Sequence, residues 1–341
     1  VNLLTITGLS QATVTNLLFV FFSFLYLLNM YLLATTLASR RGQILLITAL
    51  ACPLIFSFFH GRIHPNMLSI FTLPLLLYFY HRVVSSPADK AQNIALLFLV
   101  ALLMTFFHPI TALFAIAVLL VFALASYLHR KLAPATNPGL PLKIGKNSTK
   151  IALITSVAMV VFFCSWYLSF PSIHRSISSV YNWLAYEIIS PTEPSSLEPP
   201  VHPSLFQFLT QTLSKAEISF TQTLKLFIAR YGAVFIYLIT ALILSIMVLR
   251  KFLVKKFKRK GFQEMDFIYS IQFLVALLIS AYMLFGYAVE YNEIRIARFP
   301  LLMATILGGL VIYELVHTDS TQRVNLDRFQ PGGKALAGLI T

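Results

Sequence analysis

The chain has 341 residues, of which 58% are hydrophobic and only 11% are charged. A typical soluble domain is about 25% charged and about 45–50% apolar, so this composition excludes an ordinary soluble protein. The formal net charge of +14 would suit a nucleic-acid partner. The basic residues lie between apolar runs, however, which favours a membrane protein among lipids and argues against nucleic acid.

Nine apolar stretches follow one another along the chain. A transmembrane helix needs roughly 17–25 mostly apolar residues. The stretches cover 14–38, 43–59, 67–80, 93–107, 110–128, 151–170, 232–249, 267–288 and 299–316. Pro53, Pro74 and Pro109 interrupt the pattern where freed carbonyls need other partners. We therefore predict an all-α polytopic membrane protein with a transmembrane domain over 1–316 and a cytoplasmic tail over 317–341.

The Lys and Arg residues are unevenly divided between the two sides of the membrane. With the N-terminus outside, the inner segments hold 19 of the 26 basic residues. These segments are 39–42, 81–92, 129–150, 250–266 and the tail from 317. Such an excess follows the positive-inside rule, so we predict an N-out/C-in orientation. The basic run 250–260 is then expected at anionic lipid headgroups.

One long outer segment, 171–231, separates the sixth and seventh stretches. Its middle, 190–200, is rich in Pro, Ser and Glu. On either side the apolar residues recur at helical spacing, over about 174–189 and about 204–230. Amphipathic helices of this kind lie in the membrane interface, so we expect two interfacial helices in this loop.

The densest polar cluster lies between the second and third stretches. His60, Arg62 and His64 stand close to Gly61 and Pro65, which favour a tight loop. Two imidazoles and a guanidinium suit an anionic ligand, above all a phosphate. A short solvated turn is the alternative, and so is a metal site formed by both histidines together with His108.

A second outer segment, at His108, carries a group suited to binding phosphate. His108-Pro109 joins two stretches with almost no loop, and Pro109 fits the first turn of a helix whose positive end faces outward. The alternative is a hairpin cap that bonds its own carbonyls.

The segment before the last stretch carries two acids and then two arginines. Here Arg298 could face a phosphate, with Glu290 or Glu293 as a general base. The alternative is mutual neutralisation, of Glu290 by Arg295 or of Glu293 by Arg298.

The chain resembles the GT-C superfamily of polytopic membrane glycosyltransferases, in particular its uncharacterised archaeal and bacterial members. The resemblance rests on the motifs at 59–66 with 73–80, at 107–113 and at 295–300. It implies transfer from a polyprenyl-phosphate-linked sugar donor at the extracytoplasmic face of a prokaryotic plasma membrane. A divalent metal would be compatible with this chemistry.

One feature departs from the superfamily. GT-C enzymes usually carry a catalytic acid in the first outer loop, whereas residues 1–38 contain no acid. We therefore expect the first span and its loop to be missing from this chain. Two alternatives stay open. One is a permease or lipid-precursor transporter, which would show polar groups at mid-membrane. The other is a non-catalytic assembly subunit, whose outer polar groups would be consumed by internal ion pairs.

Overall fold

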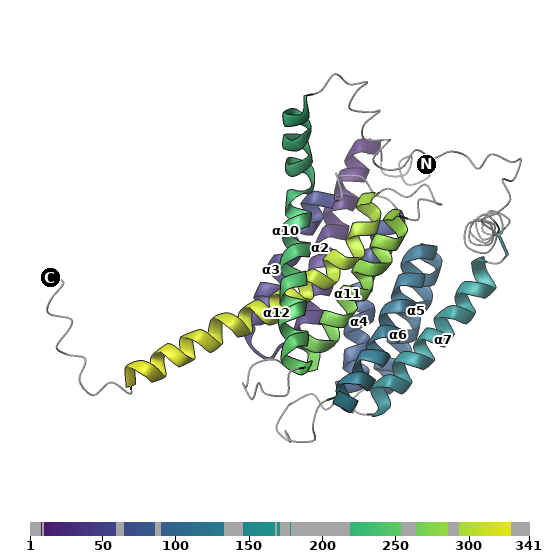
Figure 1. The fold of residues 1–341 in the computed structure, drawn as a ribbon. Helices are drawn as coiled ribbons and strands as arrows, with labels where there is room; N and C mark the ends of the chain where they lie inside the picture. Colours follow the sequence, from purple (N-terminus) through teal and green to yellow (C-terminus); the bar gives the residue numbers. More distant parts are fainter. Residues whose placement is uncertain are drawn as a thin grey trace, which may run out of the picture.

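The computed structural model describes residues 8, 10–58, 65–85, 90–132, 146–167, 169–170, 178, 219–253, 264–285 and 293–328. These residues form nine helices and no strand (Figure 1). The helices are α2 (Gln11–Leu37), α3 (Arg41–Phe58), α4 (Pro65–Ser85), α5 (Lys90–Phe107), α6 (Pro109–Leu132), α7 (Lys146–Tyr167), α10 (Phe220–Leu253), α11 (Glu264–Phe285) and α12 (Glu293–Arg328).

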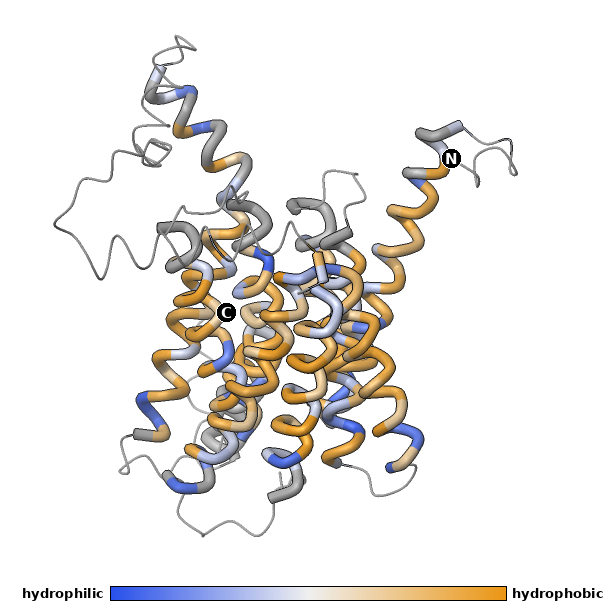
Figure 2. Tube along the Cα trace, turned by 90° about the vertical axis from the view of Figure 1, so that its right-hand side faces the viewer, coloured by the Kyte–Doolittle hydropathy of each residue, from blue (hydrophilic) through white to orange (hydrophobic). Residues whose placement is uncertain are grey.

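The helices form a membrane-spanning bundle. Eight of the nine helices in the described residues are long and apolar enough to cross a membrane. The apolar part of α3 is shorter and covers Arg41–Pro53. Apolar residues cover the middle of the bundle and polar ones gather toward its ends (Figure 2). The predicted all-α polytopic membrane fold is confirmed, and each of the nine apolar stretches lies in a helix of its own.

The centre of the bundle is α12. In its apolar window 78% of the residues are buried, against 28% in α2, α7 and α10. Helix α12 packs against α3, α10 and α11, while α6 packs against α7 and α11, and α4 packs against α2 and α5. We call the end with the α2–α3 corner and the starts of α5, α7 and α11 the inner end, after the predicted orientation. The opposite end is the outer end.

The structure corrects the predicted boundaries in the outer loop and the tail. Helix α10 is continuous from Phe220 to Leu253, so residues 220–230 extend a spanning helix beyond the bundle (Figure 1). The predicted separate interfacial helix over 204–230 is therefore wrong for this part. Its remainder lies outside the described residues, as does the helix expected over 174–189 apart from residue 178. Helix α12 continues to Arg328, so the tail begins as a helix.

Most spans are longer at the inner end than their apolar runs. Helix α4 reaches Ser85, α5 begins at Lys90 and α11 begins at Glu264. The added turns of α4 and α11 contain His81 and Asp266, which are at most 2% exposed. Hydropathy alone had assigned these turns to inner loops, because it takes no account of burial against other helices. Helices α3 and α4 also continue through Pro53 and Pro74 without ending there.

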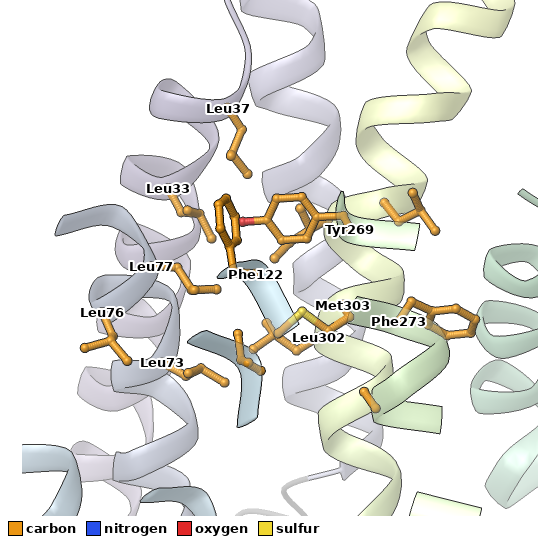
Figure 3. Close-up of a cluster of buried hydrophobic side chains, with 14 of the residues drawn as sticks. Leu33, Leu37, Leu73, Leu76, Leu77, Phe122, Tyr269, Phe273, Leu302 and Met303 are labelled. Atoms are coloured by element: carbon orange, nitrogen blue, oxygen red, sulfur yellow. The ribbon is translucent and has the colours of Figure 1, made fainter. Parts of the chain in front are cut away.

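Hydrogen bonds from polar side chains join helices that are distant in sequence. Asn29 Nδ2 donates to the Phe71 carbonyl at 2.9 Å, and Gln43 Nε2 donates to the Leu310 carbonyl at 3.1 Å. Such bonds between membrane helices are worth about 0.6 kcal/mol on average. The apolar core of the bundle contains side chains from α2, α4, α6, α11 and α12 (Figure 3).

Helices α3 and α12 approach each other through glycines. A Cβ added at Gly309 would lie 2.8 Å from Ile47 Cα and would overlap its side chain. A Cβ added at Gly42 would lie 2.8 Å from the ring of Tyr313. Small residues at membrane-helix interfaces allow close backbone packing, so Gly309 sets the spacing of the central helix.

Candidate functional site at the outer end

The first part of the candidate site is the corner between α5 and α6. Helix α5 ends at Phe107 and α6 begins at Pro109, so His108 alone joins them. The His108 carbonyl accepts the first helical bond of α6, from the amide of Ala112 at 3.0 Å. The prediction that Pro109 opens a helix is therefore confirmed. His108 is half-buried beside the positive end of α6, with its Nδ1 atom fully covered.

The second part is Arg298, near the start of α12. Its side chain is only 8% exposed, and its Nε atom is fully covered. Arginine is rarely this buried, because removing a guanidinium from water is costly unless polar or charged groups surround it. A covered cation at the outer end of a membrane bundle is suited to holding an anion.

A ring stack joins the two helices that carry these parts, α6 and α12. Phe299, directly after Arg298, stacks on Phe114 of α6 with ring centroids 4.0 Å apart and planes 29° apart. Both rings are buried, at 6% and 5% exposure. Phe114 lies less than two helical turns after His108. The outer ends of α6 and α12 are thus neighbours, although Phe114 and Phe299 are 185 residues apart in the sequence.

Most of the other predicted site residues lie outside the described part of the chain. This holds for His60, Arg62, His64 and Glu290, and for the side chain of Glu293 at the start of α12. The convergence of these groups with His108 and Arg298 therefore stays a prediction, as do the alternative ion pairs. Within the described residues no group of three or more His, Cys, Asp or Glu side chains could hold a metal ion.

The sequence analysis missed a second polar region, at the inner half of the bundle. His81 Nε2 lies 3.1 Å from the hydroxyl of Tyr269, and both side chains are fully buried. Closer to the inner end, His129 Nδ1 lies 3.5 Å from Glu264 Oε1. The sequence did contain one signal for this region. These polar residues lie next to apolar stretches, at positions that continue the helical repeat of those stretches.

The fold thus defines an integral membrane protein, a helical bundle with a buried cation at its outer end. The family model of DUF6541, a family of unknown function, matches residues 1–197. Because the match covers more than half of the chain, the protein belongs to this family. The matched part includes α2 to α7 with His108, whereas Arg298 lies beyond it. No curated protein and no solved structure matches the chain.

Proposed function

We propose that the protein is a membrane glycosyltransferase-like protein that uses a polyprenyl-phosphate-linked sugar donor at the extracytoplasmic face of a prokaryotic plasma membrane. The observation that carries the proposal is the buried Arg298 guanidinium at the outer end, next to the residue through which α12 stacks on α6, in the Phe114–Phe299 pair. A donor whose lipid tail lies in the bilayer presents its phosphate at this level of the membrane.

In the proposed reaction an acceptor oxygen attacks the anomeric carbon of the sugar. The bond from that carbon to the phosphate oxygen breaks, and the polyprenyl phosphate leaves with the bonding electrons. Arg298 and His108, with His60, Arg62 and His64, would stabilise the charge on the leaving phosphate. Glu290 or Glu293 would take the proton of the acceptor. A positioned guanidinium can bind two phosphate oxygens at once, which an ammonium cannot.

The test is binding and transfer of a polyprenyl-phosphate-linked hexose by the purified protein in nanodiscs. Hydrogen bonds to charged groups contribute about 1.5–3 kcal/mol, so Arg298→Ala should lower donor affinity roughly ten-fold to a hundred-fold. His108→Ala and Arg62→Ala should act in the same direction, and Arg298→Lys should recover only part of the loss. The matched control is Lys225→Ala, which removes an exposed cation from the outer part of α10.

Thermal stability is measured on the same samples, because Arg298 is buried and its truncation could unfold the protein. If stable Arg298→Lys, His108→Ala and Arg62→Ala variants all bind the donor like the unmodified protein, the proposal is wrong. It is also wrong if Lys225→Ala lowers affinity as much as they do, because the effect would then reflect net charge alone.

The permease hypothesis also has an observation in its favour. Polar groups are buried well inside the bundle, among them Asn29, His81 and Gln272. Asn29 is engaged in a bond between helices, which supports a structural role for that residue. Among the described residues, His81 Nδ1 and Gln272 Oε1 form no hydrogen bond. Uptake of a solute by proteoliposomes, sensitive to substitution of His81, would favour transport over sugar transfer.

A further inference from the structure

Helices α2 and α4 pack side by side and run in the same direction, toward the inner end. Two contacts define their register. Asn29 Nδ2 donates to the Phe71 carbonyl at 2.9 Å, and the ring centroids of Tyr26 and Phe71 lie 5.0 Å apart. Further toward the inner end, Leu33 of α2 and Leu77 of α4 are both fully buried in one core cluster (Figure 3). The two helices therefore advance inward together from Asn29 and Phe71.

This register places Arg82 of α4 at the α2–α3 corner. Arg82 follows Phe71 by eleven residues, which is about three helical turns, so both lie on nearly the same face of α4. That face is turned toward α2, because the Phe71 ring contacts α2 there. Eleven residues after Asn29, α2 has ended and the chain has reached Arg40, directly before α3 begins at Arg41. Arg82 therefore lies at the level of the corner and on the side of α4 that faces it.

Three guanidinium groups thus lie at one level of the inner end, and no acid balances them. Arg40 and Arg41 are exposed, and Arg40 is held over the ring of Tyr313 at 5.9 Å from its centroid. None of the three arginines forms an ion pair with a carboxylate in the described part of the chain. Helices α2, α3 and α4 carry no acid at all, because the first Asp or Glu of the sequence is Asp89. The corner is therefore a purely basic surface.

The environment of Arg82 differs from that of an arginine surrounded by water. Its side chain is half-buried and its Nε atom is fully covered, yet Nε has no hydrogen-bond partner among the described residues. The two terminal nitrogens are not covered in this way, so they remain accessible. Partly burying a guanidinium without an anionic partner is costly. The embedded Nε side fixes the group, and its two open nitrogens form a fork that matches two oxygens of one phosphate.

The start of α3 adds positive charge to the same corner. Helix α3 begins at Arg41 and has no acid in its first turn. The amides at the start of a helix carry partial positive charge and favour an anion. In the predicted orientation this corner faces the inner leaflet, where lipids carry anionic phosphate headgroups, and basic pockets between membrane helices bind such headgroups. A phosphate group therefore fits the charge, the geometry and the depth of the corner.

We propose that Arg82 and the α2–α3 corner form a binding site for a phosphate group at the inner end of the bundle. The terminal nitrogens of Arg82 donate to two phosphate oxygens, and Arg40 and Arg41 attract the anion from the corner. The phosphate belongs either to the headgroup of an anionic lipid or to a soluble phosphate anion. This site lies at the opposite end from the proposed donor site and does not depend on it.

The experiment titrates the delipidated protein, in a maltoside detergent without phosphate, with three ligands and follows the rise in Tm. Phosphatidylglycerol carries an anionic phosphate, diacylglycerol has the same tails without it, and inorganic phosphate has no tails. Phosphatidylglycerol should stabilise the protein and diacylglycerol should not. Arg82→Gln, which keeps a polar side chain but removes the charge, should weaken phosphatidylglycerol binding at least about ten-fold. Arg82→Lys should recover part of this loss, because an ammonium lacks the two-point fork.

The matched control is Lys150→Gln, which removes an exposed inner-end charge from α7, across the bundle from α3 (Figure 1). It should leave the affinity unchanged. An Arg82-dependent shift with inorganic phosphate as well identifies a soluble anion as sufficient, whereas a shift with phosphatidylglycerol alone identifies a lipid site.

Two results would overturn the proposal. One is that neither phosphatidylglycerol nor inorganic phosphate stabilises the protein more than diacylglycerol does. The other is that Lys150→Gln weakens binding as much as Arg82→Gln, because the attraction would then follow net charge alone. The titration uses no sugar donor, so failure here and failure of the proposed transferase function are separate results.

Discussion

The close approach of α3 and α12 leads to a sharp prediction for Gly309→Ala. The added Cβ would lie 2.8 Å from Ile47 Cα and 3.0 Å from Ile47 N, and it would overlap Ile47 Cγ1. Rotation of the Ile47 side chain cannot relieve contacts with its backbone, so the two helices must move apart. Overpacking of this kind costs about 1–3 kcal/mol. The Gln43 bond to the Leu310 carbonyl would lengthen with the same movement.

The assay is thermal unfolding of the purified protein in one detergent, with Gly308→Ala as the matched control. A Cβ at Gly308 would meet Leu50 Cδ1 at 3.5 Å, an ordinary contact. Alanine is also favoured over glycine in a helix by about 1 kcal/mol. This gain applies at both positions, so the two variants should differ by the overpacking cost of about 1–3 kcal/mol. A change of 1 kcal/mol shifts Tm by about 2–4 °C in chains of 150–250 residues, so Gly309→Ala should unfold at least about 2 °C below Gly308→Ala. Equal Tm values for the two variants would refute the close-packing argument.

Three other predictions test separate parts of the structure. Tyr80→Phe removes the bond from the hydroxyl to a carbonyl of α7 and should cost about 0.6–1.7 kcal/mol, whereas Tyr127→Phe, on an exposed face, should change stability little. A double-mutant cycle of Phe114→Leu and Phe299→Leu should show a coupling of about 0.5–1.5 kcal/mol, and no coupling would contradict the stack. The sequon at Asn147 should stay unglycosylated in microsomes, and sugar found on it would reverse the orientation.

The number and order of the helices were predictable because apolar runs are local. Each of the nine stretches found in the sequence lies in a helix of its own. The starts of α10 and α11 were not predictable in the same way. Thr221, Gln222 and Lys225 interrupt the apolar pattern, so hydropathy separates residues 220–230 from a helix whose backbone hydrogen bonds continue through them.

The candidate outer site was predictable only in part, for a related reason. Sequence spacing identified His108 and Arg298 as phosphate-suited groups at helix ends. It could not show that Arg298 is buried, or that α6 and α12 meet through Phe114 and Phe299. Contacts between helices so far apart in the chain leave no pattern in either segment alone.

The inner turns of α4 and α11 show why hydropathy misplaces the ends of membrane helices. A buried polar group without a hydrogen-bond partner costs about 1–3 kcal/mol. A single partner on another helix removes most of that cost. His81 has Tyr269 as such a partner, 188 residues further along the chain. The span can therefore extend by one polar turn wherever a neighbouring helix supplies a partner, and hydropathy, which takes each residue without its neighbours in space, ends the span too early.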